Sequence, residues 1–128
     1  TMERIAIESK LKDITDKIVR EFQPEKIILF GSWAWGEPQE SSDVDLFVMK
    51  KSGKSRIERG RELRRLLSGS GFPSLDILVY TPEEVDVSIN QNRNLFIEDV
   101  VRNGRVLYAR SSDDVRIADE RPLVILAP

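Results

Sequence analysis

Two short stretches decide the fold and the chemistry of this chain: Gly31-Ser32-Trp33-Ala34-Trp35-Gly36 and Ser42-Asp43-Val44-Asp45-Leu46. The first stretch follows an apolar run over 26–30, which is typical of a buried strand, and has the composition of a turn. A glycine at position 31 lets the backbone turn sharply and come close to a ligand. If a short helix begins at Ser32, its free amides and the hydroxyl point toward an anion such as a phosphate. Taken alone, a Gly-Ser turn after a strand is usually structural.

The second stretch places two aspartates at the opening of a strand. Because side chains two residues apart lie on the same face, Asp43 and Asp45 project together, while Val44, Leu46 and Val48 face the opposite side. Neighbouring carboxylates repel each other, so both are ionised only if a cation joins them. Oxygen ligands favour Mg²⁺, which also binds triphosphates. The alternative is a solvated loop end.

A third carboxylate, Asp76, lies inside an apolar run over 75–79. An aspartate in such a strand is costly unless it is paired, exposed on one face or bound to a metal. A partner from the backbone or from an arginine is the structural alternative. The combination is more specific than its parts, since Gly31-Ser32, ten residues and then Asp-x-Asp should arise by chance in roughly one chain of this length in a thousand.

Composition excludes several classes of protein. The 128 residues suit one ordinary domain, with 40% hydrophobic and 33% charged residues. There is no cysteine and no histidine, which excludes zinc sites built from them and Ser-His-Asp or Cys-His catalysis. Without cysteines or a membrane-spanning apolar run, a cytoplasmic protein that does not enter membranes is expected. The net charge of −2 does not indicate a general nucleic-acid binder.

Hydrophobic periodicity and turn signals predict the element order α-β-β-α-β-α-α-β. Helices are expected over about 2–22, in the basic segment around 56–67 with Ile57 and Leu63 on its apolar side, from Thr81-Pro82 onward, and over 95–102, and strands over 26–30, 44–49, 75–80 and 105–109. This order predicts an α/β (α+β) fold, a mixed sheet with helices packed mainly on one face. Residues 1–110 are expected to form the domain and 111–128 a tail of open role.

The two quoted stretches resemble the signature of the polymerase-beta-like nucleotidyltransferase superfamily, and within it the minimal nucleotidyltransferases. By motif, the resemblance covers about residues 27–80. It implies a metal-dependent transfer of a nucleoside monophosphate, with ATP as the substrate and Mg²⁺, or Mn²⁺ in its place, as the cofactor. It assigns nucleotide binding to Gly31, Ser32, Gly36 and Ser42. It assigns catalysis and metal binding to Asp43, Asp45 and Asp76, with Asp76 also a candidate general base.

The resemblance also implies a partner. Minimal nucleotidyltransferases are commonly paired with a helical HEPN-type protein, and in some toxin–antitoxin pairs they attach AMP to a tyrosine of that protein. Two alternatives stay open: a non-catalytic antitoxin that acts by occlusion, and a small-molecule nucleotidyltransferase of the aminoglycoside-modifying kind, which would require a homo-oligomer to form its acceptor cleft.

Three further features allow two interpretations each. Relatives often carry basic residues where this chain has Trp33 and Trp35, which either stack on a base or partner or pack under the loop. The basic helix over 56–65 either docks a partner or an RNA, or is a solvated face with Glu-Arg pairs. The polar stretch over 90–94 either borders the nucleotide pocket or links two helices.

Overall fold

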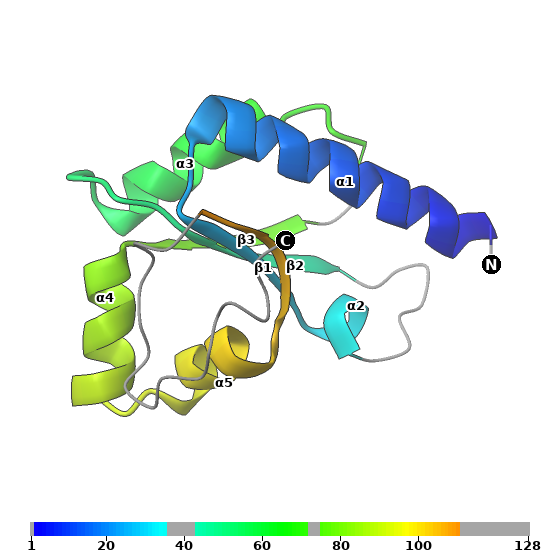
Figure 1. Cartoon of the computed structure of the whole chain (residues 1–128). Helices are drawn as coiled ribbons and strands as arrows, with labels where there is room; N and C mark the ends of the chain where they lie inside the picture. Colours follow the sequence, from blue (N-terminus) through cyan, green and yellow to red (C-terminus); the bar gives the residue numbers. More distant parts are fainter. Residues whose placement is uncertain (1, 36–42, 72–74, 111–128) are drawn as a thin grey trace.

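One mixed four-stranded sheet forms the centre of the protein (Figure 1). The computed structural model describes residues 2–35, 43–71 and 75–110. The strands are β1 (Lys26–Phe30), β2 (Val44–Met49), β3 (Leu75–Tyr80) and β4 (Arg105–Ala109). Their order is β3-β2-β1-β4, with β1 antiparallel to both neighbours and β2 parallel to β3. The predicted strand segments and the mixed sheet are confirmed.

The longer helices cover one face of the sheet (Figure 1). They are α1 (Met2–Phe22) and α3 (Arg56–Leu66). The single turn α2 (Ser32–Trp35) follows the end of β1. The three- and four-residue spacing that predicted the first helix reappears as its buried stripe, which consists of Leu11, Ile14, Ile18 and Phe22. This stripe packs on the alternate strand residues that face it: Ile27, Leu29, Val44, Leu46, Val48, Ile77 and Val79.

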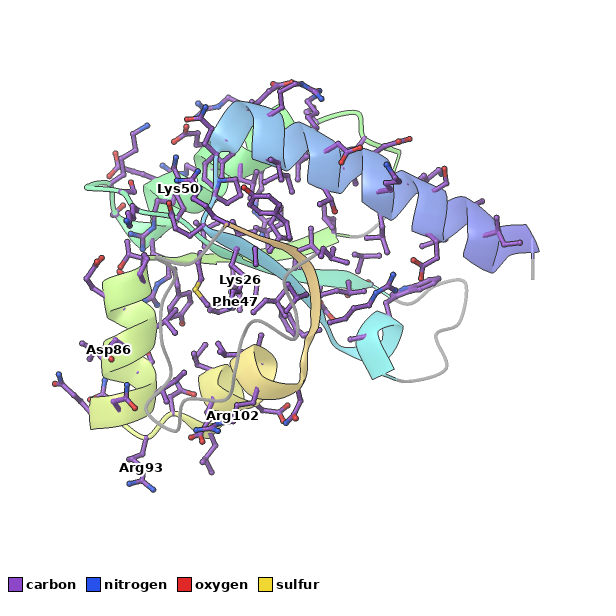
Figure 2. All side chains as sticks on the ribbon, viewed as in Figure 1. Lys26, Phe47, Lys50, Asp86, Arg93 and Arg102 are labelled. Carbon is purple, nitrogen blue, oxygen red and sulfur yellow. The ribbon has the colours of Figure 1, made fainter. Side chains whose placement is uncertain are left out.

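The other face is covered by the shorter helices, α4 (Pro82–Asp86), its π-helical continuation η1 (Val87–Gln91), and α5 (Leu95–Asn103). Their core comprises Ile28, Phe47, Met49, Val85, Ile89, Ile97, Val100 and Val101. Figure 2 shows Phe47 on this side of the sheet. The expectation of helices mainly on one face is thus refined: both faces are covered, because the strand residues 27–30 and 46–49 are apolar at every position and both sides need burial.

Helix α3 packs differently from the prediction in one respect. Ile57 is 69% exposed, whereas Arg59 is buried beside Leu63. Residues 59, 63 and 67 follow one another at four-residue spacing and therefore share a face, and position 57 lies on another side of the helix. The prediction from Ile57 was wrong because Arg59 occupies the buried face instead, where its charge has the hydrogen-bond partners described below.

Among the described residues, no helix is long and apolar enough to cross a membrane. The described residues also exclude the predicted tail over 111–128, so its role and the domain boundary at 110 stay predictions.

Candidate active site

Sheet register brings two of the three predicted carboxylates together. In the parallel pair, Asp45 of β2 is the direct partner of Asp76 of β3. On its other side Asp45 faces Phe30, the last residue of β1. Directly paired residues project from the same face of a sheet, so the three side chains form one row on the face that α5 covers. The row lies where β2 and β3 begin.

Among the described residues, the charges that shift the pKa of Asp45 are those of two other aspartates. Its pKa is raised from the ordinary value of 3.8 to about 6, first by burial, then by the negative charge of Asp76 and a hydrogen bond with it, and finally by the charge of Asp43. The carboxyl groups of Asp45 and Asp76 are therefore close enough to share a proton. Opposing charge would lower this pKa, and a bound cation is the simplest source of it.

Gly31 leaves the space that Asp45 occupies. Its backbone has φ +79°, in the left-handed region that favours glycine, and a Cβ at this position would overlap Oδ2 of Asp45. The turn after β1 and the carboxylate of β2 are therefore in contact. The predicted association of the Gly-Ser turn with the aspartate strand has a steric basis here.

A site with two carboxylates is sufficient for magnesium, which does not need a full set of protein ligands. Among the residues that the structure describes, no group of three or more Asp, Glu, His or Cys side chains is arranged to hold a metal ion. Mg²⁺, however, is usually held by one or two carboxylates, waters and substrate phosphates. Asp45 and Asp76 match that pattern, whereas exposed Asp43 acts on Asp45 through charge. Metal binding by all three aspartates stays a prediction.

Of the other predicted site residues, some lie within the part of the chain that the structure describes and some lie outside it. Ser32 is half-buried at the start of α2. Gly36 and Ser42 lie outside the described residues, as does the side chain of Trp35. Trp33 is 7% exposed and belongs to the core under the turn, so the packing interpretation holds for this tryptophan.

An aromatic pair borders the carboxylates and was missed from the sequence. The rings of Phe30 and Phe96 meet edge to face with centroids 5.7 Å apart, and Phe96 is 51% exposed. Phe30 directly precedes Gly31, which was a usable signal. Nothing in the sequence indicated that Phe96 comes to lie beside it, because 65 residues separate the two.

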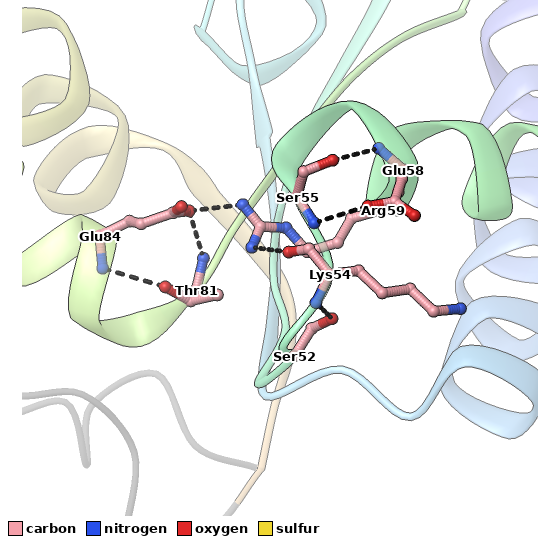
Figure 3. Close-up of polar contacts among 7 residues, drawn as sticks. All are labelled: Ser52, Lys54, Ser55, Glu58, Arg59, Thr81 and Glu84. Atoms are coloured by element: carbon pink, nitrogen blue, oxygen red, sulfur yellow. Dashed lines mark hydrogen bonds and ion pairs between the residues drawn. The ribbon is translucent and has the colours of Figure 1, made fainter.

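The basic helix contributes a structural ion pair at the far end of the sheet (Figure 3). Arg59 donates to Glu84 Oε1 at 2.7 Å and to the Lys54 carbonyl at 3.0 Å. Glu84 also accepts from the Thr81 amide and so closes a capping box at the start of α4, where the sequence predicted a helix from Thr81-Pro82 onward. The remaining arginines of α3 are exposed to solvent, as the solvated-face interpretation expects.

The polar stretch over 90–94 serves as a link between helices. The π-helical turn takes it up to Gln91, and Asn94 then caps α5 by accepting a hydrogen bond from the Ile97 amide at 3.1 Å. This is the interhelical role that the sequence left as one of two interpretations.

A strand-turn-strand unit with paired aspartates under a glycine turn offers oxygen ligands that suit a divalent metal ion beside a turn that suits a phosphate. Residues 10–113 match the family model described as polymerase beta, nucleotidyltransferase. The chain belongs to this family, and nucleotidyltransferase-type activity is the activity that membership supports.

Structural comparison agrees on the fold. A crystal structure from Sulfolobus solfataricus, described as that of a "putative nucleotidyltransferase", superposes with a TM-score of 0.59 at 21% sequence identity and covers 84% of each chain. At that identity the likeness concerns the fold alone. A search of curated proteins found no match.

Proposed function

We propose that this nucleotidyltransferase transfers AMP from ATP to a hydroxyl group of a partner protein. The observation that carries the proposal is the hydrogen-bonded pair of Asp45 and Asp76, in which Asp45 lies against the Gly31 turn and also feels the negative charge of Asp43. Carboxylates kept so close at a cost in repulsion are typical of functional sites.

The reaction moves one phosphoryl group. The acceptor hydroxyl oxygen attacks the α-phosphorus, the bond to the β-phosphate oxygen breaks, and pyrophosphate leaves. The proton of the hydroxyl passes to Asp76, which is the exposed member of the pair and therefore the one an entering acceptor can reach. No histidine is needed for this chemistry, since positioning and charge neutralisation supply most of it.

The site residues divide the remaining work. Asp45 and Asp76, with Asp43 beside them, hold Mg²⁺ or Mn²⁺, which when bound neutralises the triphosphate and acidifies the acceptor hydroxyl. Gly31 and Ser32 contact the triphosphate, as do Gly36 and Ser42 in this proposal. The absence of a side chain at Gly31 keeps the carboxylate of Asp45 in place beneath them.

The acceptor in this proposal is a tyrosine of a HEPN-type helical protein, as in toxin–antitoxin pairs. Support comes from the resemblance to minimal nucleotidyltransferases and from the exposure of Asp43 and Asp76, which leaves these two carboxylates accessible to a macromolecule. A homo-oligomer that builds a small-molecule cleft would require a stable dimer in solution, which light scattering measures.

Transfer of label from α-³²P-ATP with Mg²⁺ to the HEPN-type protein tests the proposal directly. The isosteric Asp45→Asn variant is the control, and Asp16→Asn on the exposed side of α1 is the matched surface change. Label on the partner that Asp45→Asn abolishes and Asp16→Asn retains is the expected result. Partner binding without label from any nucleoside triphosphate would instead support an antitoxin that acts by occlusion.

A further inference from the structure

We infer that the exposed ring of Phe96 is the platform on which the base of the nucleotide substrate stacks. The inference rests on the proposed function and names the part of the substrate that the carboxylates and the Gly31 turn do not bind.

The ring of Phe96 lies close to the paired aspartates. Phe30 is the register partner of Asp45, and its ring contacts that of Phe96 edge to face at 5.7 Å. Phe96 is therefore one ring beyond the carboxylate row, on the same face of the sheet. A nucleotide whose phosphates lie at Asp45 and Gly31 extends its sugar and base outward over this neighbouring surface.

The apolar side chains of α5 differ in their exposure to solvent. The remaining large apolar residues of α5 are nearly inaccessible, with Ile97 and Val100 at 1% and Val101 at 5%. Phe96 is instead 51% exposed and Leu95 75%. An amphipathic helix that turns apolar side chains to solvent only at its first residues, where it meets the site, presents a surface for a ligand.

The kind of ligand follows from the size and shape of this surface. Two side chains are far too few for the core of a protein interface, which buries about 800 Å² on each partner. One aromatic ring held edge-on by another matches a single planar base, because every base has a π-face that stacks on an aromatic side chain.

The platform is also fixed in place before any ligand arrives. Asn94 caps the helix two residues before the ring, through its bond to the Ile97 amide, and Phe30 supports the ring from the strand. A ring that is already ordered loses little entropy when a base stacks on it, which favours binding.

The test compares two ligands that differ only in the nucleoside. Dissociation constants for ATP and for inorganic tripolyphosphate, both with Mg²⁺, are measured by calorimetry on wild type, Phe96→Ala, Phe96→Leu and Phe96→Tyr. Ile57→Ala removes another exposed apolar side chain, 69% accessible, from a different surface and is the control. Unchanged thermal unfolding shows that each variant is folded, and Phe96→Leu keeps the apolar bulk if alanine is not tolerated.

The expected result is a loss confined to ATP. Its affinity falls about 5-fold to 100-fold in Phe96→Ala, the range of one lost base stack, and falls similarly in Phe96→Leu, which lacks a π-face. Phe96→Tyr and Ile57→Ala bind ATP as wild type does, and tripolyphosphate binds all five proteins equally.

Each other outcome overturns the inference in a recognisable way. ATP binding unchanged in Phe96→Ala rejects the platform and leaves the proposed function intact; if transfer to the partner is then lost, the ring belongs to the acceptor site. Equal losses for both ligands mean that Phe96 only supports the phosphate site. Wild type that binds neither ligand rejects the proposed function itself.

Discussion

The pKa values of the carboxylates at the two ends of the sheet are shifted in opposite directions. Where β2 and β3 begin, Asp45 has Asp76 as its neighbour and a pKa raised to about 6, with burial and like charge as the causes. Just after β3 ends, burial would likewise raise the pKa of Glu84, but the Thr81 amide and the Arg59 guanidinium outweigh it and the pKa is lowered.

The same end holds a second satisfied carboxylate. Glu25, 5% exposed, accepts from the Lys51 amide at 2.6 Å and pairs with Arg110 at 3.1 Å. Carboxylates with a positively charged partner in the protein stabilise the fold, whereas the carboxylate of Asp45 would gain such a partner from a bound cation. Substitution should therefore have opposite effects at the two ends, which five predictions test.

The largest effect is expected from Asp45→Asn. Transfer of AMP should fall by at least about a thousandfold, because charge stabilisation by a held metal is worth several kcal/mol. The free energy of unfolding should nevertheless rise, since the like-charge repulsion with Asp76 disappears. Radiolabel transfer and urea unfolding measure the two. A variant that is both inactive and less stable would show that Asp45 supports the fold rather than the chemistry.

Gly31→Ala should lower transfer by about a hundredfold, because the new Cβ displaces the Asp45 carboxylate and small misplacements are that costly. Gly69→Ala is the matched control: Gly69 has φ +80°, so alanine there carries a similar backbone strain of about 1–2 kcal/mol, but the space around it is open. Equal activities in the two variants would contradict a role for the contact between the turn and Asp45.

At the opposite end the effect should be on stability. Glu84→Ala leaves Arg59, with 3% of its side chain exposed, without its carboxylate, and should lower the free energy of unfolding by about 2–3 kcal/mol. Glu58→Ala removes the same position of the other capping box, on α3, where no buried arginine depends on it. Its loss in urea unfolding should be clearly smaller. Similar losses would mean that the caps, and not the ion pair, explain the effect of Glu84.

Local features of this fold could be predicted from the sequence, and long-range pairings could not. Helical periodicity predicted α1, and Thr81-Pro82 predicted the start of α4, because the interactions that decide both lie within one or two turns. The parallel pairing of β2 with β3 depends on how α3 crosses between them, which no local pattern contains.

The same limit applies to the candidate site. The Gly31 turn and Asp45 are close in sequence, so their association was predictable, and Asp76 was selected as an unusual charge in an apolar strand. The burial of Arg59 was missed because its partner Glu84 is 25 residues away. Phe96 was missed for the same reason.

The smallest effect is a shift in titration. In the metal-free protein the Asp45 carboxyl should titrate near pH 6 by carbon NMR, and Asp76→Asn should lower this pKa without restoring 3.8, because burial is the leading cause and remains. Glu84 should titrate below its ordinary 4.5 in both proteins.

The two carboxyls should also give stability opposite dependences on pH. Since the folded-state pKa of Asp45 is raised, its contribution is fully present below pH 3.8 and is lost as the pH rises through about 6. The folded-state pKa of Glu84 is lowered, so its contribution is present above pH 4.5 and is lost as the pH falls. Between about pH 5 and 6, which lies above the range in which ionisation of Glu84 changes stability, Asp76→Asn should therefore flatten the loss in urea-measured stability, whereas Glu84→Ala should leave that slope in place. An Asp45 that titrates near pH 4 in the wild type would remove the contrast between the two ends, because both would then hold satisfied carboxylates.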